Sequence, residues 1–219
     1  MNYLSYSLWG NDPLYNIGAI RNSEQIKMFY PDWQMILYYD NTVPLKTIDE
    51  LKKNGVICHN LTDSGIHGFF WRFLASDIDN AEYVCFRDCD SRLSEREYLA
   101  VKEWIESKKT LHVMRDHPAH VIPYGVREPG ILAGMWGIIS KKIQMTKLVE
   151  DFNRGKKISY GYDQVFTKMI YDFFKNDRCV HDEFFEKKPF PIKRENGRFI
   201  GERIGVNESP VTNDYKILL

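Results

Sequence analysis

The stretch Val84-Cys85-Phe86-Arg87-Asp88-Cys89-Asp90 decides how this chain is interpreted, because a short apolar run ends in two carboxylates. The run over Tyr83–Arg87 has the length and composition of a buried strand. Side chains at positions i and i+2 of an extended chain face the same way, so Asp88 and Asp90 can reach one spot beyond that strand. Two hard oxygen donors there suit Mg²⁺ or Mn²⁺, which in turn binds a diphosphate.

A D-x-D tripeptide is a weak signal by itself, since about one match is expected by chance in a chain of this length. The sequence carries its own decoy in Asp77-Ile78-Asp79, which we interpret as the solvated end of a helical stretch. Asp88 and Asp90 differ because an apolar run precedes them and a helix follows, with Ser94 as its cap and Glu97 at the capping-box position. A structural turn remains the alternative to a metal site.

Strand-like and helix-like segments alternate along the rest of the chain. The expected strands are 3–9, 34–39, 56–58, 83–87, 110–114 and 131–140, and the expected helices are 13–29, 45–54, 69–78, 94–107, 141–153 and 163–175. This alternation predicts a single α/β domain with a mostly parallel central sheet flanked by helices. Ligands of such sheets bind beyond the carboxyl ends of strands, where Asp88 and Asp90 stand.

Composition narrows the class of protein further. The chain has 219 residues, of which 43% are apolar, so a sizeable core can form. Lys+Arg and Asp+Glu both number 30, which argues against a nucleic-acid groove or an anionic-membrane surface. No apolar run approaches the length of a membrane span. The four cysteines make no CxxC pair and are expected to be reduced, partly buried thiols of a cytoplasmic protein.

The chain is expected to divide into two halves and a tail. Residues 1–110 form the first half, residues 111–182 the second half, and residues 183–219 an irregular carboxyl-terminal tail. His181 lies just before that tail. It could add a third metal ligand, although a lone histidine is more often structural.

Seven segments in order resemble the metal-dependent A-type (GT-A) glycosyltransferases, which use nucleotide-diphospho-sugar donors, and in particular small single-domain enzymes of bacteria and large DNA viruses. The segments are Tyr6-Ser7-Leu8-Trp9-Gly10, Tyr30-Pro31-Asp32-Trp33, Trp71-Arg72-Phe73-Leu74, Phe86-Arg87-Asp88-Cys89-Asp90-Ser91-Arg92, Gly134-Met135-Trp136-Gly137, Gly161-Tyr162-Asp163-Gln164 and Cys179-Val180-His181-Asp182. They span about residues 3–182, and the ordered set is more specific than the D-x-D alone. The resemblance implies that residues 1–110 are the nucleotide-binding half and residues 111–182 the sugar and acceptor half.

The resemblance implies roles for matching positions in the donor site. Asp88 and Asp90 match the motif that contacts the donor ribose and a divalent metal, Mn²⁺ or Mg²⁺, and His181 matches the late histidine that ligates the metal or lies beside the diphosphate. Arg72 matches a basic residue near the phosphates or the motif itself. Asp40 stands at a second strand end, where the base is often bound.

Further positions match the edges of the donor site and the sugar site. Ser7, Leu8 and Trp9 match the first-strand end that borders the base and ribose. Asp163 and Gln164 match the polar motif near the sugar and acceptor, where Asp163 could deprotonate the acceptor or cap a helix. The segment 134–137 matches a small-residue strand that lets substrate approach the backbone.

Two departures from the family pattern stand out. Asp182-Glu183-Phe184 follows the histidine in place of a Gly- and Lys-containing motif, so the basic phosphate clamp is unassigned. The candidates for it are Lys187, Lys188, Lys193 and Arg194. The chain also lacks a long acceptor domain.

Together these features predict an enzyme that moves a sugar from a nucleotide-diphospho-sugar, a UDP-sugar in most such families, to a glycan or other hydroxyl acceptor. The resemblance leans towards retention of configuration. One alternative is a haloacid-dehalogenase-type phosphohydrolase, which expects Thr or Val where Arg92 stands. The others are a nucleotidyltransferase, whose Gly- and Lys/Arg-rich first loop is missing, and a non-catalytic nucleotide-sugar-binding module. The sugar, the acceptor and the oligomeric state stay open.

Overall fold

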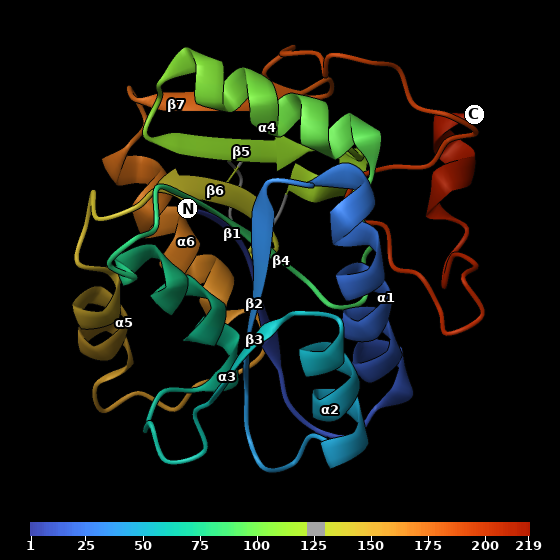
Figure 1. Cartoon of the computed structure of the whole chain (residues 1–219). Coiled ribbons are helices and arrows are strands. Elements are labelled where there is room, and N and C mark those ends of the chain that lie inside the picture. Colours follow the sequence, from blue (N-terminus) through green and yellow to red (C-terminus); the bar gives the residue numbers. More distant parts are fainter. Residues whose placement is uncertain (122–129) are drawn as a thin grey trace.

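A computed structural model describes residues 1–121 and 130–219, and Figure 1 shows them as one central sheet with helices on both faces. The strands are β1 (Asn2–Leu8), β2 (Trp33–Tyr39), β3 (Ile57–Asn60), β4 (Tyr83–Arg87), β5 (Leu111–Arg115), β6 (Met135–Ile139) and β7 (Arg178–Asp182). Their order across the sheet is β3-β2-β1-β4-β6-β5-β7. Only β6 among these strands runs antiparallel to its neighbours, β4 and β5. The predicted α/β architecture with a mostly parallel sheet is confirmed.

The helices follow the predicted pattern with one exception. They are α1 (Pro13–Phe29), α2 (Leu45–Lys53), α3 (Gly68–Trp71), α4 (Glu95–Ser107), α5 (Met145–Asn153) and α6 (Tyr162–Phe173), with 3₁₀ turns η1 (Arg72–Asp77), η2 (Pro118–Val121) and η3 (Asp214–Leu218). The single helix expected over 69–78 is instead a short α-helix followed by η1. Both backbone groups of Arg72 are engaged by β1: its N–H donates to Ser7 Oγ (2.9 Å), and its carbonyl accepts from the Ser5 hydroxyl (2.7 Å).

Two hydrophobic layers sandwich the sheet, because successive strand residues face opposite sides. In β4, Val84 and Phe86 pack with the side chains of η1, α5 and α6, whereas Cys85 packs with those of α1, α2 and α4. The two layers of helices lie on opposite sides of the sheet in Figure 1. Because β1 and β4 are parallel neighbours, both strands end at the same edge of the sheet. The polar residues of the site lie at that edge.

The tail returns across that same edge. Phe190 and Ile200 pack with Ala100, Met114 and Met135 in a third, smaller apolar cluster. The backbone N–H of Ile204 then donates to the carbonyl of Asp90 (2.7 Å), which fixes this part of the tail beside the D-x-D motif.

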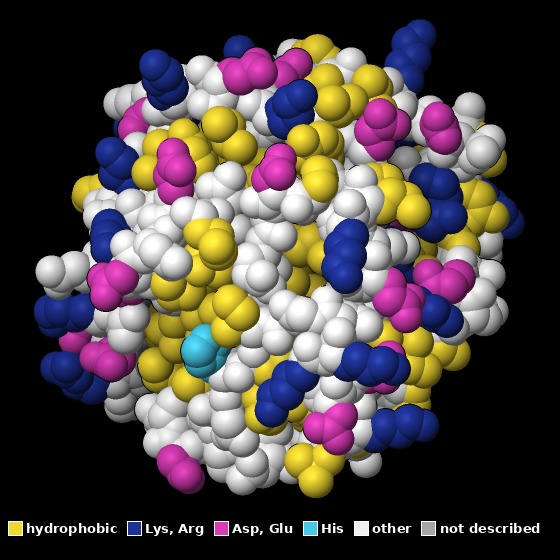
Figure 2. Space-filling model, viewed as in Figure 1, with side chains coloured by type: hydrophobic (Ala, Val, Ile, Leu, Met, Phe, Trp, Pro, Cys, Tyr) yellow, Lys and Arg dark blue, Asp and Glu magenta, His cyan; other side chains and the backbone are white. Residues whose placement is uncertain are grey.

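The surface is electrostatically mixed, in keeping with a net charge of zero. Figure 2 shows cationic and anionic side chains interspersed over the face in view. No helix within the described residues combines the length and the apolar character that crossing a bilayer requires.

Candidate active site

A cleft of about 690 Å³ opens beyond the carboxyl ends of β1 and β4. Segments far apart in the sequence meet there: the first strand end, the D-x-D turn, the start of α6 and the tail. The lining residues are Ser7, Leu8, Trp9, Gly10, Asn11, Asp12, Tyr15, Phe69, Arg72, Asp88, Asp90, His120, Leu132, Ala133, Met135, Tyr160, Gly161, Asp163, Gln164, Gly201 and Arg203. The cleft thus gathers most of the residues that the sequence singled out.

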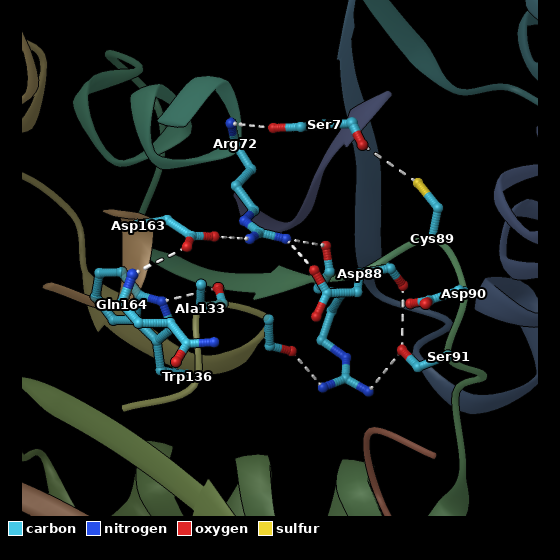
Figure 3. Close-up of polar contacts among 12 residues, drawn as sticks. Ser7, Arg72, Asp88, Cys89, Asp90, Ser91, Ala133, Trp136, Asp163 and Gln164 are labelled. Carbon is cyan, nitrogen blue, oxygen red and sulfur yellow. Dashed lines mark hydrogen bonds and ion pairs between the residues drawn. The ribbon is translucent and has the colours of Figure 1, made fainter. Parts of the chain in front are cut away.

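Arg72 joins the two acidic parts of the site (Figure 3). Its Nη1 contacts Asp88 Oδ1 and also donates to the Arg87 carbonyl (3.3 Å), while its Nη2 lies 3.2 Å from Asp163 Oδ2. The guanidinium is buried, and the side chain is oriented by the backbone bonds that tie Arg72 to β1. One fixed cation therefore neutralises two carboxylates that are 75 positions apart in the sequence.

Asp88 faces the open cleft, with 47% of its side chain exposed. It lies directly over Gly134, where an added Cβ would stand 2.0 Å from Asp88 Oδ2. The sequence interpretation was that small residues over 134–137 let substrate approach the backbone. In the structure the space at Gly134 holds the Asp88 carboxylate, and Gly137 faces the indole of Trp104 in the core, so that interpretation is wrong for Gly137.

Asp90 is buried beside the tail, and its Oδ2 accepts from Arg203 Nε (2.8 Å). Burial and the neighbouring Asp88 carboxylate raise the pKa of Asp90, and Arg203 opposes that rise. Two carboxylates this close repel each other when both are ionised. Each has an arginine partner, Arg72 for Asp88 and Arg203 for Asp90.

A buried ion pair at the end of β4 supports the D-x-D motif. Arg87 Nη2 lies 2.8 Å from Glu97 Oε2, with both side chains fully buried, and Arg87 Nη1 donates to the Gly134 carbonyl (2.7 Å). The sequence predicted a capping box at α4. Ser94 does cap the Glu97 N–H (3.2 Å), but the Glu97 carboxylate turns inward to Arg87 and the Tyr30 hydroxyl (3.0 Å). Glu97 therefore fixes the end of β4 rather than the start of its own helix.

Asp163 and Gln164 lie in the first turn of α6. Burial raises the pKa of Asp163 and Arg72 opposes that rise, while Asp163 Oδ1 accepts from the Gln164 N–H (3.0 Å). The Gln164 side chain lines the cleft, and within residues 1–121 and 130–219 its Oε1 is buried with no hydrogen-bond partner. An acceptor without a donor is costly unless a ligand supplies one.

The first-strand end is in the cleft, as the resemblance implied, but Asp40 is outside its lining. Ser7 binds the Arg72 N–H, and Trp9 is 39% exposed, with its ring edge-on to Phe69. Asp40 accepts from Thr42 N (3.0 Å) and holds the turn after β2. Thr42 Oγ1 in turn accepts from the N–H of Gly10 (2.6 Å), which lines the cleft. Asp40 is therefore linked to the cleft lining through Thr42.

His181 is not near the two aspartates, so the expected three-ligand metal site is wrong. It is buried on β7, three strands away from β4 in the sheet, and its Nδ1 lies 2.9 Å from His112 Nε2. Its Nε2 lies 3.0 Å from Glu103 Oε2. Parallel pairing of β7 with β5 sets this position, because it places His181 opposite Met114 rather than at the cleft. Among the described residues no group of three or more His, Cys, Asp or Glu side chains could hold a metal.

The basic residue of the tail at the cleft is also not one of the expected candidates. Arg194 is bound to Asp116 (2.6 Å) and Glu183, while Lys187, Lys188 and Lys193 are exposed and absent from the cleft lining. Arg203 takes that place. Three further cleft residues, Tyr15, Tyr160 and His120, were not predicted, because none of them belongs to a recognisable sequence motif. Pro118 and Ala119, which precede His120, do not indicate a cleft position either.

The remaining donors still fit a divalent metal of the Mg²⁺ or Mn²⁺ type. Mg²⁺ is commonly held by one or two carboxylates, with substrate phosphates and water completing the shell. Asp88 and Asp90 would supply such a pair at a cleft wide enough for a phosphate group, and a bound cation would offset their mutual repulsion.

No protein-family model matches the sequence, and no curated protein is similar enough in sequence to match it. Solved structures are similar in fold. The galactosyltransferase LgtC, in a complex with donor and acceptor sugar analogs, is 13% identical with a TM-score of 0.53, over 84% of this chain and 74% of that one. TarS from S. aureus is 16% identical with a TM-score of 0.51, over 87% of this chain and 59% of that one.

A nucleotidyl-type enzyme shares the architecture as well. The 4-diphosphocytidyl-2C-methyl-D-erythritol synthase from Anaerococcus prevotii is 11% identical with a TM-score of 0.51, over 88% of this chain and 92% of that one. These likenesses, together with the strand order and the single antiparallel strand, show that the chain has the GT-A fold of nucleotide-diphospho-sugar transferases.

Proposed function

We propose that this protein is a glycosyltransferase that moves a sugar from a nucleotide-diphospho-sugar, most simply a UDP-sugar, to a hydroxyl acceptor. The observation that carries the proposal is Arg72, a buried cation that binds Asp88 and Asp163 inside the cleft. This arrangement places the D-x-D turn and the start of α6 on either side of one guanidinium. A donor diphosphate and its sugar need these two kinds of groups next to each other.

Asp88 and Asp90 would hold Mn²⁺ or Mg²⁺, which when bound acts as a Lewis acid on the leaving diphosphate. The chain's own cations add to this neutralisation, because negative charge gathers on the leaving group as the glycosidic bond breaks. Arg72 is fixed in position before the reaction, so it needs no reorganisation. Ser7, Leu8 and Trp9 would border the base and ribose at the neighbouring strand end.

Asp163 and Gln164 would act on the sugar side of the cleft. Asp163 accepts the proton of the acceptor hydroxyl, whose oxygen forms the new glycosidic bond while the nucleoside diphosphate leaves. Arg72 favours the ionised form of Asp163 that this step requires. Gln164 Oε1, which has no hydrogen-bond partner among the described residues, would accept from a sugar hydroxyl. A single displacement with Asp163 as the base predicts inversion of configuration. Retention, towards which the resemblance leans, would instead require that the acceptor attack on the face that the diphosphate leaves, with the diphosphate taking the acceptor proton and Asp163 orienting the sugar. The anomeric proton signal of the product distinguishes the two outcomes.

A thermal-shift screen of nucleotide sugars with and without Mn²⁺ tests the proposal, because a ligand of the folded state raises the unfolding temperature by mass action. We expect one donor to stand out, and to do so more strongly with Mn²⁺. The same donor should be hydrolysed slowly and transferred when an acceptor is added. A shift without any turnover would support a binding module instead.

Pyrophosphate release from a nucleoside triphosphate and a sugar phosphate would instead support a nucleotidyltransferase. The A. prevotii synthase is similar in fold to this chain. Release of phosphate from a generic phosphoester would support a phosphohydrolase. If no nucleotide sugar shifts the unfolding temperature, the proposal fails.

A further inference from the structure

Arg203 forms an ion pair with Asp90. Among the described residues, no other charged side chain of the tail is paired with either aspartate of the D-x-D motif. Its backbone is firmly placed. The carbonyl of Arg203 accepts from the Val211 N–H (2.9 Å), and the next residue, Ile204, donates to the Asp90 carbonyl (2.7 Å). Glu208 binds Arg92 through two contacts of 3.0 Å each. The segment 203–211 is therefore anchored to the motif from both sides.

The side chain of Arg203 is in contrast half exposed, at 50%, while the Asp90 side chain that it binds is 12% exposed. An ion pair whose arginine is half exposed is weaker than a fully buried pair, because solvent screens the charge and the long side chain gives up rotamer freedom to hold one geometry. The guanidinium can therefore change partner by rotating its own side chain, with the anchored backbone keeping it at the cleft.

Arg203 and a divalent cation compete for the same carboxylate. Arg203 Nε stands 2.8 Å from Asp90 Oδ2, the group that would ligate the metal. Two cations at one carboxylate repel each other unless further negative charge enters the site. A donor diphosphate brings that charge, and guanidinium groups bind phosphate oxygens in a well-matched geometry.

We propose that Arg203 exchanges partners when the donor binds: its guanidinium leaves Asp90 for the diphosphate, and the freed Asp90 carboxylate binds the divalent cation. This inference rests on the proposed function and deepens it. Metal alone then binds weakly, since it must displace Arg203 without compensation. Nucleotide and metal bind cooperatively, and the coupling is equal in both directions.

The test is calorimetric titration of the full chain with MnCl₂ alone, with UDP alone, and with each in the presence of the other. For the unmodified chain we expect UDP to raise the Mn²⁺ affinity by about tenfold. In Arg203→Ala, Mn²⁺ alone should bind severalfold tighter, because Asp90 is free from the start. UDP in the presence of Mn²⁺ should bind about tenfold more weakly, because one charge-assisted bond to phosphate is lost.

Lys193→Ala is the matched control, since it removes one exposed positive charge from the same tail outside the cleft lining. It should leave both affinities unchanged. Opposite shifts of the two affinities in Arg203→Ala support the exchange. Mn²⁺ affinity that is unchanged or lower in that variant overturns it, while the proposed function stands as long as the unmodified chain binds both ligands. If the unmodified chain binds neither UDP nor Mn²⁺, the proposed function itself is overturned, and the exchange with it.

Discussion

Replacing Arg72 with methionine should destabilise the protein strongly, because the change leaves two carboxylates without their shared cation. Methionine keeps much of the apolar stem, so the lost charge dominates the effect. Breaking a buried ion pair by removing one partner costs about 3 to 5 kcal/mol, whereas an exposed pair is worth about 0 to 1 kcal/mol.

The magnitude follows from the exposure of each carboxylate. Asp163 has 12% of its side chain exposed and belongs to the buried class, whereas Asp88, at 47%, belongs to the exposed class. The cleft admits water to both, which lowers the upper limit. We therefore expect Arg72→Met to lower the free energy of unfolding by about 3 kcal/mol at pH 7.5.

Urea unfolding measures this loss, with an unchanged slope showing that the variant is compact. Asp163→Asn in the Arg72→Met background should recover at least about 1 kcal/mol, because the unpaired buried charge is gone. Arg154→Ala is the control. It breaks a surface pair with Asp151 in which Arg154 is 78% exposed, and should cost less than about 0.5 kcal/mol.

The pH dependence gives a second check. Without Arg72 the pKa of Asp163, already raised by burial, rises further above its unfolded value. The folded variant then binds a proton that the unfolded chain does not, so the variant gains stability relative to the unmodified protein as pH falls. A loss as small as that of Arg154→Ala, or one that the Asp163→Asn change does not reduce, would refute this reasoning.

Three further predictions follow from the site and the core. Gly134→Ala places a methyl group 2.0 Å from Asp88 Oδ2 and should reduce Mn²⁺–UDP affinity at least about tenfold while the fold is retained; calorimetry at full affinity would contradict the assigned position of Asp88. Asp163→Asn should lower kcat at least about a hundredfold with donor binding largely kept, and near-normal turnover would remove Asp163 from the mechanism. Burial lowers the pKa of both His112 and His181, so stability should fall as pH drops below about 6.5, where the unfolded histidines take up protons first. His112→Gln, with one buried histidine fewer, should show a shallower fall in urea unfolding between pH 7.5 and 5; equal slopes would count against this interpretation.

The sequence was most informative where local pattern and tertiary position agree. The apolar run over 83–87 and the cap at Ser94 predicted β4 and α4 closely, and parallel pairing of β1 with β4 placed Ser7, Asp88 and Asp90 at one edge. Such predictions need only strand direction, since the carboxyl ends of parallel neighbours meet.

The misses have a common physical origin in long-range pairing. His181 belongs to a polar strand, β7, whose position next to β5 no local pattern gives, and that pairing places the side chain beside His112 instead of in the cleft. Arg203 belongs to a tail without periodicity, and reaches Asp90 because Ile204 and Glu208 are anchored 114 and 116 residues from their partners, Asp90 and Arg92. The partners of the Glu97 carboxylate could not be predicted for the same reason. The position of Glu97 in the capping sequence can be read from neighbouring residues, whereas its ion pair with Arg87 depends on how α4 packs against β4.

Titration of Mn²⁺ in the presence of UDP, for the unmodified chain and two aspartate variants, most directly decides whether the D-x-D turn binds a metal. Asp90→Ala removes a buried carboxylate at the cleft, while Asp79→Ala removes the exposed second aspartate of the other D-x-D sequence in this chain. We predict that Asp90→Ala weakens Mn²⁺ binding at least about tenfold and that Asp79→Ala leaves it unchanged. Equal Mn²⁺ affinity in the unmodified chain and in Asp90→Ala would contradict the metal site and the sugar transfer inferred from it.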